Sequence, residues 1–319
     1  MSKAFSRRNF LATGSLAIAG GTVWLNLSQS KASRFLRARA AEIAKPALNA
    51  GHKPDPNSWS DHELTASWLG HSTVLINFFG VNILTDPVLF SRVGANVGSL
   101  TVGPKRREAP ALTASELPRI DLVLLSHAHF DHFDIPSLQQ LKASTVVATA
   151  ANTSDLFSET ALRAINEFKW GESRKIETAS GVIEVSAFQV RHWGARIRHD
   201  QHRGYNGYVL KRGGKSVLFG GDTALCDTFK DARCAQAIDL ACMPIGAYNP
   251  WVNSHCNPEE AVQMANDANA NYILPMHHFT FRFGREPWNE PMERLEAALD
   301  KEQERIALKK AGQTFTLPS

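Results

Sequence analysis

The chain has 319 residues and 43% of them are hydrophobic, which is enough apolar material for one large domain or two small ones. Its formal net charge of +4 is unevenly distributed, because nine Lys and Arg residues but a single acid, Glu42, precede Pro54. From Pro54 onward the chain has 26 basic and 30 acidic residues. The positive charge therefore belongs to the N-terminal segment, and the composition argues against a body that binds nucleic acid.

An export signal is predicted over residues 1–32. Arg7 and Arg8 precede a moderately hydrophobic run from Phe10 to Leu27, and the small residues at 30–32 suit cleavage. The sequence SRRNFL resembles the twin-arginine signal. We therefore expect a periplasmic or exported protein. The alternative is a membrane anchor, because the run is about as long as the minimum needed to span a bilayer.

Residues 33–58 are basic and rich in alanine, and Pro54 and Pro56 break the segment. This composition predicts a linker or a short helix from Ser33 to about Ala44, whose basic residues would suit contact with a membrane surface. The strand patterns begin after this segment, so we place the main domain at 59–319.

Three strands are predicted at the start of this domain. The segments ELTASWLGH, STVLINFF and VNILTDP alternate or run hydrophobic with β-branched residues, and Gly80 separates the second from the third. His71 ends the first segment and Asp86 lies at the end of the third. An Asp before a Pro also begins turns, so spacing alone gives Asp86 two interpretations. The basic cluster Lys105–Arg107 further along is interpreted as a solvated loop.

The segment LVLLSHAHFDHFD, residues 122–134, combines a buried strand with candidate metal ligands. Its four leading hydrophobic residues predict a strand that positions the polar residues after it. Alternate residues of an extended loop point the same way, so His127 and His129 can bind one cation while Asp131 and His132 face a neighbouring point. This arrangement suits two metal ions side by side. The alternative is a group of polar surface residues.

Four further segments place a histidine or an aspartate after a strand or before a helix. GVIEVSAFQVR, KSVLFGG and YILPM are predicted strands, and PEEAVQMANDA is a predicted helix. The two glycines of KSVLFGG allow the backbone to come close to a metal. The residues that these segments position are His192, Asp222, His255, His277 and His278.

The remaining pattern defines the fold class. A helix is predicted over about 158–168, another in PMERLEAALDKEQERIAL, and a closing strand near 314–317. The predicted strands run in two groups with helices between and after them. We therefore expect an α/β protein in the form of an αββα sandwich, with the metal loops gathered at one edge.

The HxHxDH pattern at 127–132 resembles the metal signature of the metallo-β-lactamase-fold hydrolases. Its flanks, GPKR, ELP and PIGAY, resemble one branch, the N-acyl-phosphatidylethanolamine-hydrolysing phospholipase D family and its bacterial relatives. The resemblance covers about residues 60–319 and implies the αββα sandwich of the metallo-β-lactamase type. It also implies that Asp86 braces a metal-bound histidine, and that His71 is a structural or supporting histidine.

The resemblance further implies two metal ions. Three histidines would hold one ion, Asp131 and two histidines the other, and Asp222 would be shared. His277 matches the last ligand by position, but His278 stands where an aromatic residue is expected, so both stay candidates. Imidazole and carboxylate ligands point to zinc and also accept manganese or iron. The implied metal ligands are His127, His129, Asp131, His132, His192, Asp222 and His277.

Two adjacent cations lower the pKa of a bridging water toward neutrality, which favours hydrolysis. The resemblance implies phosphodiester hydrolysis of an N-acyl-phosphatidylethanolamine-like lipid by a metal-bridging hydroxide. Asp131 would hold or shuttle the proton, and His255 would contact the substrate or assist the leaving oxygen. One alternative is a lactone or carbonyl-ester hydrolase of the same fold. Another is a non-catalytic exported metal-binding envelope protein, against which Asp131 and Asp222 argue.

Overall fold

The structure is a computed structural model that describes residues 46–97, 100–232 and 237–318. The predicted export signal and the predicted helix from Ser33 to Ala44 lie outside these ranges. Pro46–Ser319 forms a compact unit of its own. Within the described ranges, no helix has the length and hydrophobicity needed to cross a bilayer.

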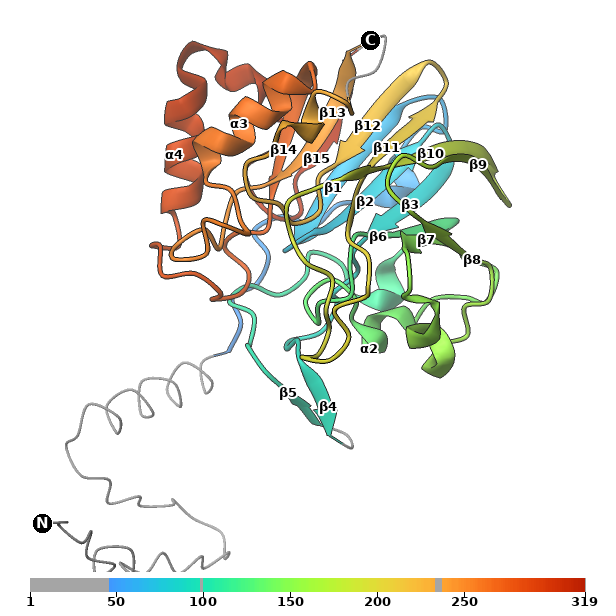
Figure 1. Cartoon of the computed structure of the whole chain (residues 1–319). Coiled ribbons are helices and arrows are strands. Elements are labelled where there is room, and N and C mark those ends of the chain that lie inside the picture. The colour runs from blue at the N-terminus through green and yellow to red at the C-terminus, as the bar shows by residue number, and fades with distance from the viewer. Residues whose placement is uncertain (1–45, 98–99, 233–236, 319) are drawn as a thin grey trace, which may run out of the picture. The chain divides into compact units, whose positions relative to one another are not determined.

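Two mixed β-sheets form this unit (Figure 1). The first has the strand order β15-β1-β2-β3-β6-β7-β8, and the second has the order β14-β13-β12-β11-β10-β9. The strands of the first sheet are β1 (Leu64–Gly70), β2 (Thr73–Phe78), β3 (Val81–Thr85), β6 (Leu122–Leu125), β7 (Val146–Ala150), β8 (Ile165–Phe168) and β15 (Thr314–Thr316). Those of the second are β9 (Ser173–Thr178), β10 (Gly181–Gln189), β11 (Asn206–Arg212), β12 (Lys215–Phe219), β13 (Ile238–Pro244) and β14 (Ala270–Met276).

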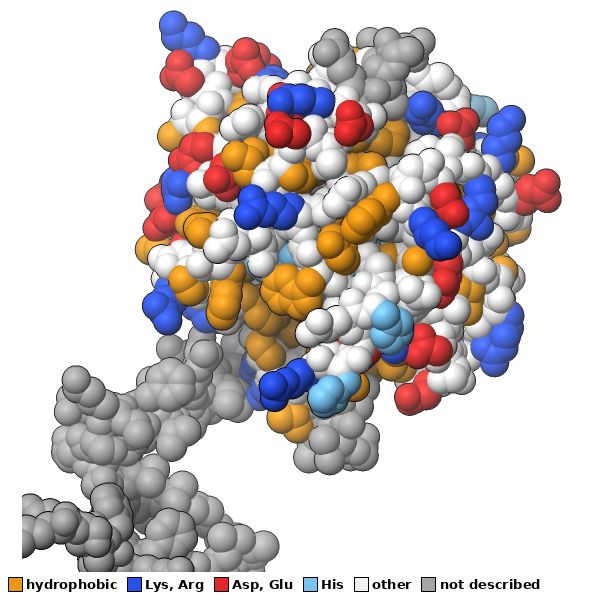
Figure 2. Space-filling model, in the orientation of Figure 1, with side chains coloured by type: hydrophobic (Ala, Val, Ile, Leu, Met, Phe, Trp, Pro, Cys, Tyr) orange, Lys and Arg blue, Asp and Glu red, His pale blue; other side chains and the backbone are white. Residues whose placement is uncertain are grey.

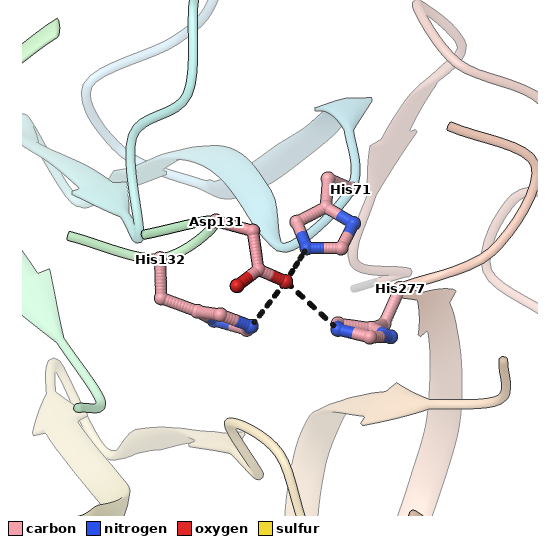
Figure 3. A group of neighbouring side chains, drawn as sticks. All are labelled: His71, Asp131, His132 and His277. Carbon is pink, nitrogen blue, oxygen red and sulfur yellow. Dashed lines mark hydrogen bonds and ion pairs between the residues drawn. The ribbon is translucent and has the colours of Figure 1, made fainter. Parts of the chain in front are cut away.

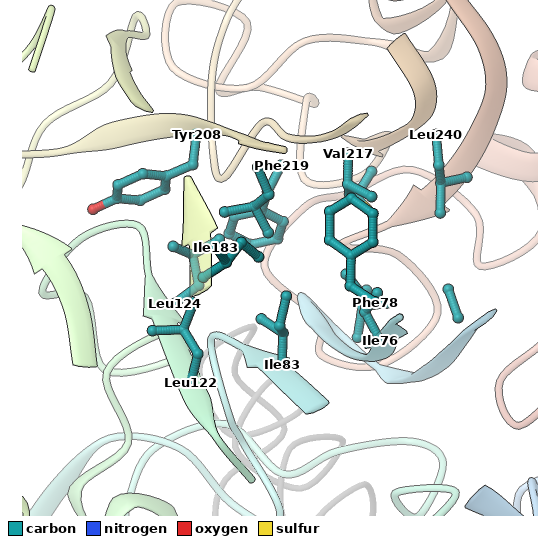
Figure 4. Close-up of a cluster of buried hydrophobic side chains, with 14 of the residues drawn as sticks. Ile76, Phe78, Ile83, Leu122, Leu124, Ile183, Tyr208, Val217, Phe219 and Leu240 are labelled. Carbon is teal, nitrogen blue, oxygen red and sulfur yellow. The ribbon is translucent and has the colours of Figure 1, made fainter. Parts of the chain in front are cut away.

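The sheets pack face to face because their strands carry hydrophobic residues on the inner side. Figure 4 shows this inner core, in which Ile76 and Leu124 of the first sheet meet Val217 and Phe219 of the second. Val123, the neighbour of Leu124 on β6, points to the opposite side and enters a separate outer core. This alternation explains why β6 is an unbroken hydrophobic run, since a sheet covered on both faces needs apolar residues on both.

Helices cover the outer faces of the two sheets. α3 (Pro258–Asp267) and α4 (Glu290–Leu299) lie beside β13 and β14, where Met264 and Leu295 share a core with Met243 (Figure 1). The short helix α2 (Ile135–Leu138) packs with Leu138 on the first sheet, beside Phe157 of a 3-10 helix. The order helix, sheet, sheet, helix confirms the predicted αββα sandwich.

The strand directions bring the carboxyl ends of β3, β6, β7, β8, β10, β12, β13 and β14 to one edge. β3, β6 and β7 run parallel, as do β12, β13 and β14, while β10 is antiparallel to β11 and β11 to β12. The sheets meet there, because Asn206 N donates to Ser126 O (2.9 Å) and His127 forms a β-bridge with Tyr205. We call this the site edge: the edge formed by the loops after β3, β6, β10, β12, β13 and β14. The loop after β3 includes a projecting hairpin, β4 (Ala95–Val97) and β5 (Leu100–Val102).

The predicted helix at 158–168 is wrong. A 3-10 helix (Ser154–Glu159) is followed there by β8, which pairs in parallel with β7. The Glu167 carboxylate accepts hydrogen bonds from the backbone N–H groups of residues 152–154 at 2.7 to 2.9 Å. Pairing with a neighbouring strand and these bonds outweigh a helix propensity of a few tenths of a kcal/mol per residue.

The prediction of a solvated loop at 105–107 is wrong for its central residue. Arg106 is 2% exposed, its Nη1 donates to Val88 O (3.0 Å), and its guanidinium lies 5.5 Å from the centre of the Phe281 ring. Consecutive residues of an extended segment face opposite sides, so one of three adjacent basic residues points into the body. Its aliphatic stem and planar head suit such a place better than a lysine would.

Candidate metal centre

Asp86 joins the loop after β3 to the loop after β6. Its Oδ1 accepts a hydrogen bond from Ser126 N (2.8 Å), and its Oδ2 accepts from the Ser126 hydroxyl and from His132 Nδ1 (2.6 Å each). Burial raises the pKa of Asp86, and the charge and hydrogen bond of His132 oppose that rise. The expected contact of Asp86 with a histidine is therefore present, and it leaves His132 Nε2 facing the cluster.

Three histidines converge from two loops of the site edge. His127 Nε2 lies 2.8 Å from His129 Nδ1, and His192 Nε2 lies 3.2 Å from the same atom. Behind them, Ser126 Oγ lies 2.8 Å from His127 Nδ1, and His192 Nδ1 donates to Ser254 O (3.0 Å). Tetrahedral ligands with bonds of about 2.0 Å lie about 3.3 Å apart, so these nitrogens suit a single cation.

A second group gathers around Asp131 (Figure 3). Its Oδ2 lies 2.9 Å from His71 Nε2, 3.5 Å from His132 Nε2 and 3.7 Å from His277 Nε2. His71 lies in the turn between β1 and β2, and its carbonyl accepts a hydrogen bond from His277 N (2.9 Å). One carboxylate oxygen thus meets three imidazoles that come from three separate segments of the chain.

Asp222 stands between the two groups. Its Oδ2 lies 3.1 Å from Nε2 of both His132 and His277, and 3.8 Å from His192 Nε2. Gly221 precedes it with φ +57°, and a Cβ there would lie 2.7 Å from the Cβ of Ser126. A residue without a side chain is therefore required for this carboxylate to approach the loop after β6.

The pKa values of the clustered side chains are shifted in different directions. Burial, and next the charge of His132, hold the pKa of His127 well below its usual range. Burial alone would lower the pKa of His277, but the charge of Asp222 together with the interactions with Asp131 and Asp222 outweighs burial and raises the pKa to about 9. Burial acts to raise the pKa of Asp131 and Asp222, yet their histidine neighbours, His132 first, hold both well below the usual value. The two carboxylates are ionised and are compensated by positive charge at this place.

His255 lies beside both groups. Its Nδ1 is 3.7 Å from Asp222 Oδ2, and its ring centre is 5.2 Å from those of His192 and His277. Burial lowers the pKa of His255 to about 4. The side chain is 11% exposed, so part of the ring is open to solvent.

The structure separates the two adjacent candidates after β14. His277 enters the cluster, whereas the ring of His278 stacks on Trp68 with centres 4.5 Å apart and an interplanar angle of 21°. Burial lowers the pKa of His278 to about 3, as expected for an imidazole packed in the core. His278 therefore packs against a core tryptophan, in the place where an aromatic residue was expected.

Unpaired polar atoms test whether metal ions fit these residues. An unpaired buried polar atom costs about 1–3 kcal/mol, so several in one place indicate a missing partner. Imidazole nitrogens with carboxylate oxygens form the donor set of zinc and of related divalent ions. The residues present therefore fit metal ions. The buried atoms of the cluster without a hydrogen-bond partner are His132 Nε2, Asp222 Oδ1, His255 Nδ1 and both ring nitrogens of His277.

Two residues of the site escaped sequence reasoning. Ser126 connects Asp86 to His127, and its only sequence signal is its place at the end of a buried strand. Arg196 lies in an irregular loop that gives no signal at all. Its Nη1 donates to Ala128 O (3.1 Å) and Phe133 O (2.7 Å), and thereby holds the loop after β6 in shape.

Known proteins are similar to this chain in sequence. Residues 81–278, more than half of the chain, match the Beta-lactamase superfamily domain. An uncharacterized protein of Mycobacterium tuberculosis is 31% identical over 300 residues, which cover 91% of this chain and 76% of that protein. The N-acyl-phosphatidylethanolamine-hydrolyzing phospholipase D 1 of Caenorhabditis elegans is 31% identical over 271 residues, covering 77% of this chain and 72% of that one.

Solved structures agree on the fold. The solved structure of Igni18, a metallo hydrolase from Ignicoccus hospitalis, superposes with a TM-score of 0.60 at 19% identity, covering 80% of this chain and 99% of that one. At such identity the likeness concerns the fold alone. Together with the domain match and the buried clusters of His and Asp, it shows that the chain belongs to the beta-lactamase superfamily, with the metallo-β-lactamase fold of its metal-dependent hydrolases.

Proposed function

We propose that this protein is a binuclear metal-dependent hydrolase that cleaves phosphodiesters. The observation that carries the proposal is the position of Asp222 Oδ2, 3.1 Å from His132 and His277 and 3.8 Å from His192. A carboxylate oxygen between two groups of imidazoles suits a pair of cations a few ångströms apart. When bound, such a pair polarises a phosphoryl oxygen and lowers the pKa of water. We assign zinc from the donor set, with manganese or iron as alternatives.

The chain's own residues would move the protons. Asp131 is held by His71 Nε2 at 2.9 Å and its pKa lies well below the usual value, so it can orient the attacking water and pass its proton on, but it is too weak a base to keep that proton. His255 is partly open to solvent, and its Nδ1 lies 3.7 Å from Asp222 Oδ2. Its pKa of about 4 makes the imidazole neutral near pH 7, so it can contact the substrate and give the leaving oxygen a hydrogen bond from its ring N–H. We therefore assign catalytic roles to Asp131 and His255.

The substrate class that we propose is an N-acyl-phosphatidylethanolamine-like lipid. Support comes from the Caenorhabditis elegans relative, whose name states that activity, and from its match over 77% of this chain. Water would add across the phosphodiester bond and give phosphatidic acid and an N-acyl amine alcohol.

A substrate panel tests the proposal. Metal-loaded protein is incubated with bis-p-nitrophenyl phosphate, an N-acyl-phosphatidylethanolamine in mixed micelles, a sugar lactone and an aryl ester. We expect turnover of the two diesters that is abolished by a chelator. Turnover of the lactone or ester alone would replace the proposal with a carbonyl-ester hydrolase, and turnover of nothing would favour a metal-binding envelope protein.

We also propose that the protein works outside the cytoplasm. The support is the sequence of residues 1–32, with Arg7 and Arg8 before a hydrophobic run. A centre built from segments that lie far apart in the chain must fold before it can hold metal, and the twin-arginine route suits a protein that is exported after folding.

A further inference from the structure

Exposed hydrophobic side chains gather on the site edge. Of the nine most exposed large hydrophobic residues among those described, six lie on its loops. Trp170 follows β8 at the same edge, where it donates to Tyr205 O, and Leu48 and Val182 lie elsewhere. A soluble protein scatters such residues singly, so their concentration around one opening indicates a surface that contacts something apolar. The six are Phe90, Val102, Trp193, Ile197, Trp251 and Val252.

These side chains flank the candidate metal centre on opposite sides. The Trp193 ring lies 4.7 Å from that of His129. On the other side, Trp251 Nε1 donates to Phe283 O (3.2 Å), and the Phe283 ring lies 5.7 Å from that of His71. An apolar partner that covers these residues would therefore also cover the entrance to the centre.

The same edge carries an excess of positive charge. Its six loops, 87–108, 126–134, 190–205, 220–237, 245–257 and 277–289, contain twelve basic and eight acidic residues, a net +4, whereas residues 54–319 together have 26 basic and 30 acidic ones, a net −4. The rest of the body therefore carries −8. Among the basic residues of the loops after β3, β10 and β14, Arg191, Arg198 and Arg285 are exposed, Arg106 and Arg203 are buried, and the others are partly buried.

We propose that the site edge docks on an anionic lipid bilayer. Tryptophan is the residue that prefers the level of the lipid head groups, and each Lys or Arg near an anionic surface adds about 1 kcal/mol of attraction. The mixture of basic, histidine and hydrophobic side chains is visible on the lower part of the face in Figure 2. The inference rests on the proposed function in one respect, namely that a lipid substrate would enter from the docked side.

A nucleic acid would also be attracted by the charge, but the apolar residues favour the bilayer. Val102, Ile197 and Val252 are more than half exposed and offer neither charge nor a flat ring to stack on a base. Aliphatic side chains at the tips of loops gain free energy only from burial in an apolar phase.

Co-sedimentation of the full chain with vesicles tests the charge component. Vesicles of phosphatidylcholine are compared with vesicles that also contain phosphatidylglycerol. The double variant R198E/R285E reverses two exposed charges of the site edge. Its matched control, K175E/K211E, makes the same change beside Glu184 of β10, away from that edge. We expect about a tenfold or larger loss of partitioning into anionic vesicles for the first pair, and less than about a twofold loss for the second.

A second pair of variants tests the apolar component. Trp251→Ser should lower partitioning by about fivefold, whereas Val182→Ser, an exposed hydrophobic residue at the start of β10 and away from the site edge, should leave it unchanged. Thermal unfolding midpoints check that all variants are folded. The N-terminal basic segment is the same in every variant, so differences among them report on the edge.

Equal losses in the edge variants and their controls would overturn the proposal, as would tighter binding of a single-stranded oligonucleotide than of anionic vesicles. Turnover of soluble bis-p-nitrophenyl phosphate is measured in parallel. If that turnover is present and the edge variants bind vesicles normally, docking fails while the proposed function stands. If that turnover is absent and the edge variants lose vesicle binding, docking stands while the proposed function fails.

Discussion

Asp222 is the side chain on which both groups of imidazoles depend. Asp222→Ala removes the oxygen at 3.1 Å from His132 and His277, so metal content should fall below one ion per chain and diester turnover should fall at least about a hundredfold. Elemental analysis and turnover of a soluble diester measure this. The control is Asp227→Ala, whose side chain is 91% exposed five residues further on. Full metal content with normal turnover in Asp222→Ala would contradict the shared role.

Asp86 affects the candidate metal centre through its hydrogen bonds to Ser126 and His132. Asp86→Asn replaces an acceptor of three hydrogen bonds by an amide that offers one oxygen, so His132 loses the bond that orients it. We expect metal affinity to fall about 10–100-fold, measured by competition with a chelator of known affinity. Asp239→Asn is the matched control, because this carboxylate is also buried and accepts a hydrogen bond from Ser216 N (2.9 Å), but it joins the starts of β13 and β12, at the end of these strands away from the site edge. A similar loss in both variants would indicate a general effect on stability.

Residues whose role follows from local spacing were predictable, and residues that depend on unusual backbone geometry were not. The loop at 127–132 brings its ligands together by alternation alone. The turn residue His71 and the loop residue His277 both have positive φ, +54° and +61°, which sequence patterns do not predict for histidine. This is why the contact of His71 with Asp131, and the choice between His277 and His278, needed the structure.

At the level of elements, Glu167 shows how a side chain can fix a strand and a loop together. Burial acts to raise its pKa, but the hydrogen bonds from residues 152–154 outweigh burial and lower it. A lowered folded-state pKa adds stability that is full above the unfolded pKa, near 4.5, and is lost as pH falls through the folded value. Glu167→Gln should therefore cost roughly 1 kcal/mol near pH 7, and the difference from wild type should shrink below about pH 4.

Urea unfolding at several pH values measures this difference. Glu177→Gln on β9 is the control, because this exposed glutamate has none of those backbone partners. A cost for Glu167→Gln that does not depend on pH would show that the carboxylate charge is not what matters.

The helices and strands also fall into those that the sequence predicts and those that it does not. Strands with strong hydrophobic runs, such as β6 and β13, were predictable because burial on both faces demands that composition. β8 was not, since its residues at 165–168 favour a strand only beside β7. The hairpin of β4 and β5 lies within a loop and has three-residue strands, too short for a periodic pattern.

On the scale of the whole molecule, both sheets contribute to the candidate metal centre. The first sheet contributes the loop that carries His127 and Asp131, and the second contributes Asp222 and His277. Metal ions held between them would tie the two sheets together. Saturating metal at about a thousand times its Kd adds about 4 kcal/mol per site. Removing it with EDTA should lower Tm by about 10 °C, measured by scanning calorimetry, and readdition of zinc should restore it. An unchanged Tm would indicate that these residues bind no metal in the folded protein.

The export proposal is also a property of the whole chain. Replacing Arg7 and Arg8 by lysine keeps the charge but removes the guanidinium pair, so the precursor should accumulate in the cytoplasm. Fractionation of the producing cells measures this, with Arg34→Lys and Arg37→Lys, which follow the predicted signal, as the control. Export of the double variant at the normal rate would rule out the twin-arginine route.

The order of the ligands along the chain has a consequence for synthesis. The first contributing residue, His71, emerges from the ribosome some two hundred residues before His277, and β15, which pairs with β1, lies within the last six residues. A nascent chain therefore presents the ligands of the loop at 127–132 long before Asp222 and His277 exist to complete the set. The full ligand set comes together only once nearly the whole chain has been made.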